Sequence, residues 1–199
     1  YQLNSNGRST DLLQAVHNIN EFQKVYLIDR AVHEAGFNFN QKTVALLGLA
    51  FKKRTNDMRD SAALKVVESL LVRGVQAIRA YDPLAMEDAQ RYWFNPEKNH
   101  LFDRITYHDS AREAMEGSDV LYISTDWEEF RGLSRTIETA VKPPYLVIDG
   151  RRMIPDYNAL VREGYEYLPV GGALLRPHTE EAPSDNNQMP IRVPNNQKE

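Results

Sequence analysis

The chain has 199 residues, of which 42% are hydrophobic and 26% charged, and its net charge of -4 gives a pI near 5.8. These values are typical of a folded globular protein and lack the basic stripe that nucleic-acid binding requires. No window reaches the ~18 apolar residues of a membrane span and no leader segment is evident, so a cytoplasmic protein with no membrane or nucleic-acid partner is expected. The absence of cysteine excludes disulfides, thiolate zinc sites and a cysteine nucleophile within these residues.

The first predicted element is a long helix. Residues 1–10 are polar and turn-rich, and a chain that begins with Tyr1 instead of Met is expected to be a fragment or a processed product. From Asp11 to Ala35 apolar residues recur at helical spacing, and Gly36 provides a stop. A helix of about 25 residues exceeds the usual ~11–12. It either packs on its own domain alone or also joins that domain to a neighbour or a second subunit, and the pattern leaves both open.

A cationic loop follows the first predicted strand. Thr43–Leu47 is short, apolar and β-branched, as is typical of a buried parallel strand, and it ends at Gly48. Before a helix predicted over Ser61–Arg73, the loop carries four cations: Lys52, Lys53, Arg54 and Arg59. Cations beside a helix N-terminus can bind phosphate. On composition alone, a solvated loop surface explains them equally well.

Strands and helices alternate along the rest of the chain. Further strands are predicted over Gln76–Tyr81, Ile105–His108, Val120–Ser124, Tyr145–Ile148 and Tyr165–Pro169. The helices between them are predicted over Leu84–Trp93, Asp109–Gly117 (with Asp109 as its cap), Leu133–Val141 and Pro155–Glu163. This order indicates right-handed βαβ units and a mainly parallel sheet flanked by helices, an α/β Rossmann-like fold.

The first strand-to-helix turn does not carry a dinucleotide-binding motif. Of the pattern G-x-G-x-x-G only Gly48 is present, and the diphosphate of a dinucleotide could not approach this backbone closely. Asp82 ends the second strand, where such folds bind a ribose, but Pro83 follows it and a turn is the preferred interpretation. If phosphate binds here, side-chain cations therefore have to make the contacts that the glycine-rich backbone makes in a dinucleotide-binding turn.

Candidate site residues follow the first, fourth and fifth predicted strands. Because the carboxyl ends of parallel strands meet at one edge, Lys52, Arg59 and Arg151 are expected to approach one crevice. Phe51 and Trp127 are candidate apolar walls, although core packing is preferred for Trp127. Arginine offers a bidentate fork and lysine a compact charge to phosphate. The scattered histidines predict no metal site, and no local signature predicts a catalytic residue.

Five sequence blocks then resemble a known family. NEFQK in the first helix, GLAFKKRTNDMRDSAALKVVESLLVRG, YDP, TDWEEFR and DGRR occur in this order. Over about residues 11–172 they resemble the carboxyl-terminal domain of the UDP-glucose/GDP-mannose dehydrogenase family. The motifs AFKK, YDP and DGRR are most similar to those of its UDP-glucose 6-dehydrogenases. Such enzymes oxidise the 6-hydroxymethyl group of a nucleotide sugar to a carboxylate with two NAD and a covalent cysteine intermediate. In the family the NAD domain and the cysteine precede this region, so this chain alone is expected to be inactive.

The resemblance also implies roles for individual residues. It implies that Phe51, Lys52 and Arg151 contact the nucleotide sugar and that Arg59 reaches the NAD diphosphate. It does not single out the two other loop cations that the charge argument counts. It further favours the interface role for the long helix, as part of a homodimer or a higher homo-oligomer.

The expected organisation has three parts. Residues 1–36 form the end of a central helical dimerisation segment, residues 37–175 a UDP-sugar-binding α/β domain, and residues 176–199 a flexible tail. UDP-glucose is the expected substrate, NAD the cofactor, and the missing N-terminal NAD-binding domain a partner. The alternatives are the same domain of a UDP-N-acetylmannosamine or GDP-mannose dehydrogenase, or a non-catalytic nucleotide-binding or assembly module.

Overall fold

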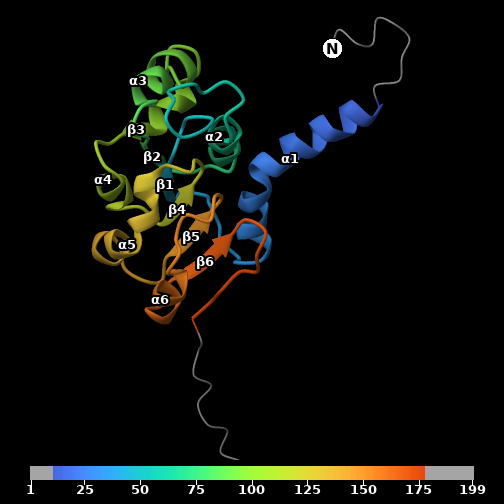
Figure 1. Ribbon diagram of the computed structural model, residues 1–199. Coiled ribbons are helices and arrows are strands. Elements are labelled where there is room, and N and C mark those ends of the chain that lie inside the picture. Colours follow the sequence, from blue (N-terminus) through green and yellow to red (C-terminus); the bar gives the residue numbers. More distant parts are fainter. Residues whose placement is uncertain (1–10, 178–199) are drawn as a thin grey trace, which may run out of the picture.

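The computed structural model describes residues 11–177, which contain a six-stranded parallel sheet (Figure 1). The strand order is β3-β2-β1-β4-β5-β6, and every neighbouring pair is parallel. The strands are β1 Thr43–Leu47, β2 Ala77–Tyr81, β3 Ile105–Tyr107, β4 Val120–Ile123, β5 Leu146–Asp149 and β6 Glu166–Pro169. The predicted α/β Rossmann-like fold is therefore confirmed.

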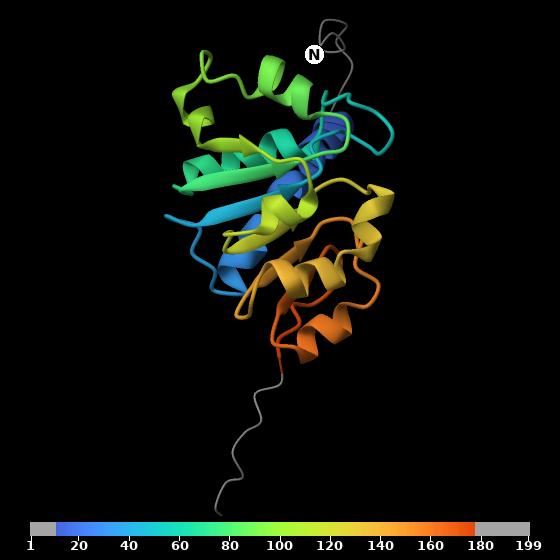
Figure 2. The same ribbon diagram turned by 90° about the vertical axis from the view of Figure 1, so that its left-hand side faces the viewer.

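Helices cover both faces of the sheet. The longer ones are α1 Asp11–His33, α2 Ala62–Val72, α4 Ala111–Met115, α5 Ser134–Ala140 and α6 Tyr157–Arg162. Short helical turns are α3 Met86–Asp88, the π-turn η2 Ala89–Trp93 and the 3₁₀ turns η3 His100–Arg104 and η4 Glu128–Gly132. α1 packs against α2, and Figure 2 shows α4, α5 and α6 in front of the sheet with α1 behind it. The predicted long first helix is confirmed.

The chain changes direction at the centre of the sheet, between β1 and β4. From β1 it winds outward through β2 to β3, then crosses back to β4 and continues the other way. Leu47 pairs with both Tyr81 and Ile123, and Ile123 pairs with Asp149, so these strands end level with one another. Open α/β sheets bind ligands beyond the carboxyl ends of strands at such a switch point.

One predicted helix cap is wrong. Ser110, not Asp109, is the N-cap of α4, and its hydroxyl accepts a hydrogen bond from the backbone N–H of Glu113 (3.2 Å). The Glu113 carboxylate in turn accepts from the backbone N–H of Asp109 (3.1 Å). Serine followed three residues later by glutamate is the spacing of a capping box, which decides between the two adjacent candidates.

Structure continues past Ala173, where the sequence pattern ends. Leu175 forms an isolated antiparallel bridge with Tyr167 of β6, and Arg176 donates to the backbone oxygen of Glu34 (2.6 Å). The predicted flexible tail falls mostly on residues 178–199, which lie outside the described part of the chain, as do residues 1–10. Within residues 11–177 no helix has the length and apolar character needed to cross a bilayer.

We expect Gly48→Ala to destabilise the protein by more than about 2 kcal/mol, because a left-handed conformation costs a non-glycine residue ~1–2 kcal/mol before any clash. Gly48 has φ +91°, and a Cβ there would lie 2.5 Å from Cβ of Thr125. Gly117 is the matched control, since its φ is +77° but a Cβ would meet nothing within 4 Å. Urea denaturation of both variants measures the difference, and equal losses would contradict the close approach at Gly48.

Candidate functional site

The carboxylate of Asp82 organises the carboxyl edge of the sheet. Asp82 follows β2, is fully buried and accepts five hydrogen bonds. Oδ2 accepts from the backbone N–H groups of Leu49 (2.7 Å) and Ala50 (3.0 Å) and from the Trp127 indole (3.0 Å). Oδ1 accepts from the N–H groups of Leu84 and Ala85, which form the turn expected at Asp82-Pro83. A buried carboxylate needs such donors in place of water.

The turn after β1 is thereby fixed on several sides. Besides the two bonds to Asp82, the Thr125 hydroxyl donates to the backbone oxygen of Ala50 (2.7 Å), and the Ser61 hydroxyl donates to that of Leu49 (2.7 Å). Ser61 is also the N-cap of α2. Asp82 therefore cannot also hold a ribose, and this turn lacks the later glycines of a dinucleotide-binding loop. The turn after β1 therefore does not form an NAD cradle of the usual kind.

The loop over residues 51–59 is closed by a backbone hydrogen bond, and three of its four cations are exposed. The backbone N–H of Phe51 donates to the backbone oxygen of Asp57 (2.8 Å), and the Phe51 ring is 52% exposed. Lys52 is exposed and makes no hydrogen bond or ion pair within residues 11–177. The Arg59 guanidinium donates to both oxygens of Asp57, with Nη2 at 2.7 Å from Oδ2. Lys52 is thus the available cation of this loop, whereas Arg59 has an internal anion.

The two remaining loop cations are held by acidic residues after β4. Lys53 lies 2.8 Å from Glu128 and 3.7 Å from Asp126, and Arg54 lies 3.8 Å from Glu128. The Lys53 ion pair, with a smaller effect from Arg54, lowers the pKa of Glu128. These contacts explain why the charge pattern alone overestimates the number of cations available to a ligand.

Arg151 is held by its backbone and by its side chain. Its N–H donates to Oδ1 of Asp149 (3.0 Å), and its Nε donates to the backbone oxygen of Ser124 (2.7 Å). Its Nη1 and Nη2 make no hydrogen bond within the described residues. A Cβ on Gly150 would come within 2.7 Å of the Ile123 oxygen, so the turn requires glycine there. Arg151 therefore presents two free donors from a fixed position.

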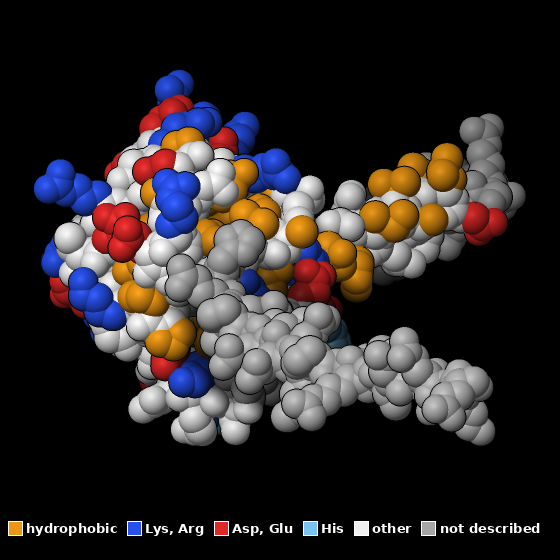
Figure 3. All heavy atoms as spheres, turned by 90° about the horizontal axis from the view of Figure 1, so that it is seen from below, with side chains coloured by type: hydrophobic (Ala, Val, Ile, Leu, Met, Phe, Trp, Pro, Cys, Tyr) orange, Lys and Arg blue, Asp and Glu red, His pale blue; other side chains and the backbone are white. Residues whose placement is uncertain are grey.

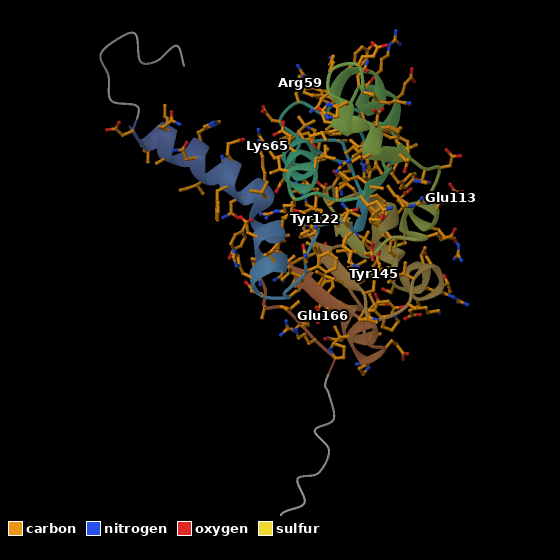
Figure 4. The ribbon with its side chains drawn as sticks, turned by 180° about the vertical axis from the view of Figure 1, so that it is seen from behind. Arg59, Lys65, Glu113, Tyr122, Tyr145 and Glu166 are labelled. Atoms are coloured by element: carbon orange, nitrogen blue, oxygen red, sulfur yellow. The ribbon has the colours of Figure 1, made fainter. Side chains whose placement is uncertain are left out.

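A cleft of about 200 Å³ lies between α1 and the ends of β4 and β5. Its polar lining comes from Asn20, Gln23, Lys24, Ser124 and Arg151. Figure 4 shows Tyr122, which also lines it, beside α1, and Arg59 farther along, above α2. Of the four predicted ligand-binding residues only Arg151 lines this cleft. Phe51, Lys52 and Arg59 lie on the loop after the neighbouring strand β1, at the same edge of the sheet.

Trp127 is a core residue, as preferred from the sequence, since it is 8% exposed and its indole donates to Asp82. Sequence reasoning missed that Asp82 and Asp149 are buried acceptors for loop N–H groups. The available signal was their position: each follows or ends a strand and precedes Pro83 or Gly150, where a turn leaves backbone N–H groups without partners.

The fold and this edge define an α/β domain of the nucleotide-binding type, in which loop cations stand where glycines usually do. Residues 45–156 match the family described as UDP-glucose/GDP-mannose dehydrogenase family, UDP binding domain. The match includes more than half of the 199 residues, and the chain belongs to this family.

Individual relatives agree with this assignment. The chain is 38% identical over 167 residues to a UDP-glucose 6-dehydrogenase of Pseudomonas aeruginosa, covering 83% of this chain and 35% of that protein. It is 33% identical over 167 residues to UDP-glucose 6-dehydrogenase YwqF of Bacillus subtilis, covering 84% of this chain and 36% of that protein. This chain therefore spans about a third of the length of these relatives.

Solved structures of similar proteins share the fold. A UDP-glucose dehydrogenase from Pyrobaculum islandicum superposes with a TM-score of 0.66 at 26% identity, over 85% of this chain and 34% of that one. A UDP-D-ManNAc dehydrogenase from Pyrococcus horikoshii superposes with a TM-score of 0.61 at 27% identity, over 85% and 35%. Proteins named for two different UDP-sugars are thus similar to this chain.

We expect Asp82→Ala to destabilise the protein by at least about 3 kcal/mol, because it leaves five donors without their acceptor, four of them in buried hydrogen bonds, and each buried group costs ~1–3 kcal/mol. Asp109→Ala is the control, since Asp109 is exposed and does not cap α4, and its effect should stay within ~0.5 kcal/mol. Denaturant unfolding gives both values. A loss below 1 kcal/mol for Asp82→Ala would contradict this role.

The Asp57–Arg59 pair predicts a specific pH dependence. Hydrogen bonds from Arg59 lower the pKa of Asp57 to about 2. Because this pKa is lower in the folded chain than in the unfolded one, the pair stabilises the fold above pH 3.8 and this contribution is lost as the pH falls towards 2. NMR titration of the Asp57 carboxyl carbon should give a midpoint near 2 that rises in Arg59→Ala. An unchanged midpoint would show that Arg59 does not hold this carboxylate.

Proposed function

We propose that this chain is the nucleotide-sugar-binding part of an NAD-dependent UDP-glucose 6-dehydrogenase. The observation that carries the proposal is the pair of Lys52 and Arg151, whose terminal nitrogens make no hydrogen bond or ion pair within residues 11–177. Both follow strands of the central sheet in a chain that belongs to a UDP-binding family. The complete protein would convert UDP-glucose, two NAD⁺ and water into UDP-glucuronate and two NADH, with the release of three protons.

The chemistry of the two cations suits a diphosphate. Lys52 supplies a compact charge and Arg151 a planar fork that can donate two parallel hydrogen bonds to phosphate oxygens. Phe51, beside Lys52, offers an exposed aromatic ring to the rest of the ligand. In this proposal the three residues bind and orient the nucleotide sugar, and the chemical step belongs to residues outside this chain.

NAD would be bound mainly by the part of the protein that precedes this chain, since the turn after β1 does not form a cradle for it. We propose that Arg59 reaches the diphosphate of NAD from this side. Its side chain is 80% exposed, and among the described residues its guanidinium forms hydrogen bonds with Asp57 alone, which lies on the same loop. Cofactor binding would then replace one anion of Arg59 by another.

UDP-glucose is the preferred substrate because the similar proteins of Bacillus subtilis and Pseudomonas aeruginosa, at 33% and 38% identity, are named for it. The similarity to a UDP-D-ManNAc dehydrogenase makes UDP-N-acetylmannosamine the second candidate. A 2-acetamido group replaces the 2-hydroxyl in that sugar, so side-by-side titration of the two ligands separates the candidates.

The first half of α1 is proposed as an interface. It projects from the domain, and Figure 3 shows hydrophobic side chains along it. Leu12, Val16, Ile19 and Phe22 follow helical spacing and are each 48–77% exposed. A stripe of this kind is usually covered in the native assembly. We propose that the preceding part of the protein and a second copy in a homodimer or higher homo-oligomer cover it.

We predict that Lys52→Ala and Arg151→Ala each weaken UDP binding by roughly 1.5–3 kcal/mol, or tenfold to a hundredfold, the cost of one charged hydrogen bond. Lys53→Ala is the matched control, because Lys53 is held by Glu128 and Asp126. Isothermal titration of the 199-residue chain with UDP measures all three. Equal affinity of wild type and Lys52→Ala would remove Lys52 from the site.

Activity of the complete protein separates the enzyme from a non-catalytic binding module. We expect the complete protein to form two NADH per UDP-glucose, and this chain alone to form none. UDP binding without any NADH from the complete protein would favour the binding module.

A further inference from the structure

We propose that Tyr167, on the outermost strand β6, is a positioning residue for Arg151, acting through the buried carboxylate of Asp149. This inference rests on the proposed binding of a nucleotide diphosphate by Arg151. It assigns a role in that site to a residue that does not line the cleft.

The first step is the environment of Asp149, the last residue of β5. Asp149 is fully buried, and no salt bridge reaches it within residues 11–177. Its carboxylate is held by three neutral donors: the N–H of Arg151 (3.0 Å), the N–H of Ile154 (3.0 Å) and the hydroxyl of Tyr167 (2.8 Å). Two of these donors belong to the turn that carries Arg151, and only Tyr167 comes from another strand.

The second step is how firmly Tyr167 itself is held. Its ring is 1% exposed and stacks on Tyr157, with centroids 4.7 Å apart and planes 3° from parallel. Its backbone N–H and oxygen both bond to Leu175. Burial and the neighbouring carboxylate raise the pKa of Tyr167 above its ordinary value, so its hydroxyl keeps its proton and donates to Asp149.

The third step links Asp149 to the orientation of the Arg151 guanidinium. Arg151 is fixed at two points, its N–H by Asp149 and its Nε by the Ser124 oxygen. If the carboxylate of Asp149 rotates, its hydrogen bond with the Arg151 N–H is lost. The Arg151 backbone is then less restrained, and the position of its Nη1 and Nη2 varies. Of the three donors to the Asp149 carboxylate, the Tyr167 hydroxyl is the one that lies outside the turn and holds the carboxylate in its orientation. An Arg151 guanidinium that is displaced from its position loses much of its interaction with a bound diphosphate.

A matched pair of variants tests the inference in the 199-residue chain. Tyr167→Phe removes the hydroxyl that reaches Asp149. Tyr165→Phe removes an equally buried hydroxyl, which donates to the Val141 oxygen (2.9 Å) and not to the Arg151 turn. We expect Tyr167→Phe to weaken UDP binding about threefold to tenfold, less than the loss expected for Arg151→Ala because Arg151 is misplaced and not removed, and Tyr165→Phe to change it less than about twofold.

A double-mutant cycle separates positioning from general loosening of the fold. In an Arg151→Ala background the effect of Tyr167→Phe on UDP affinity should fall below about twofold, because the residue it positions is gone. Amide hydrogen exchange at Arg151 and Ile154 should also accelerate in Tyr167→Phe and not in Tyr165→Phe. The exchange readout needs no ligand.

The outcomes are distinct. Wild-type binding with equal losses in the two tyrosine variants, or a Tyr167→Phe effect that persists without Arg151, overturns the positioning role and leaves the proposed function standing. Absence of UDP binding by the wild type overturns the proposed function, and the positioning role falls with it.

Discussion

The structure depends on buried carboxylates at the ends of strands, which accept the hydrogen bonds of turn N–H groups that water cannot reach. Asp82 after β2 and Asp149 at the end of β5 are both fully buried and bind the backbone N–H groups of adjacent turns. An unpaired buried N–H is costly, so each carboxylate restricts its turn to a narrow set of conformations. One turn precedes Phe51 and Lys52, and the other carries Arg151. The two cations that we propose bind the ligand therefore follow turns whose backbone is held in place.

This arrangement differs in kind from a dinucleotide-binding Rossmann edge. There, glycines let the backbone approach a diphosphate and an acidic residue binds the ribose. Here the corresponding acid, Asp82, faces inward and holds the turn, while Thr125 packs so closely on Gly48 that the turn has little space beside it. Charge is supplied by side chains that reach beyond the turn. In our proposal such an edge binds phosphate without resembling an NAD site.

The sequence predicted the sheet well because buried parallel strands are short apolar runs, and several are followed at once by residues that favour a turn, such as Gly48 after β1, Asp82-Pro83 after β2 and Gly150 after β5. It also located the candidate cations, since they follow those runs directly. The charge pattern alone could not distinguish Lys52 from Lys53, although the family resemblance singled out Lys52, because the difference in charge pairing depends on Glu128, which is far away in the chain and close in space. The cap of α4 was misassigned because Asp109 and Ser110 are adjacent and both are good caps, and only the position of Glu113 decides between them. One of the three donors to Asp149 is the Tyr167 hydroxyl, a contact between strands that periodicity does not predict.

The central claim is that side-chain cations, and not backbone amides, bind the diphosphate at this edge. The most direct measurement is NMR of the 199-residue chain as UDP is added, following the side-chain nitrogens of Lys52 and Arg151 and the backbone amides of residues 48–50. The account predicts that the two side chains shift together along one binding curve while those amides stay within the range of distant residues. Shifts of the amides with unchanged Lys52 and Arg151 would contradict it.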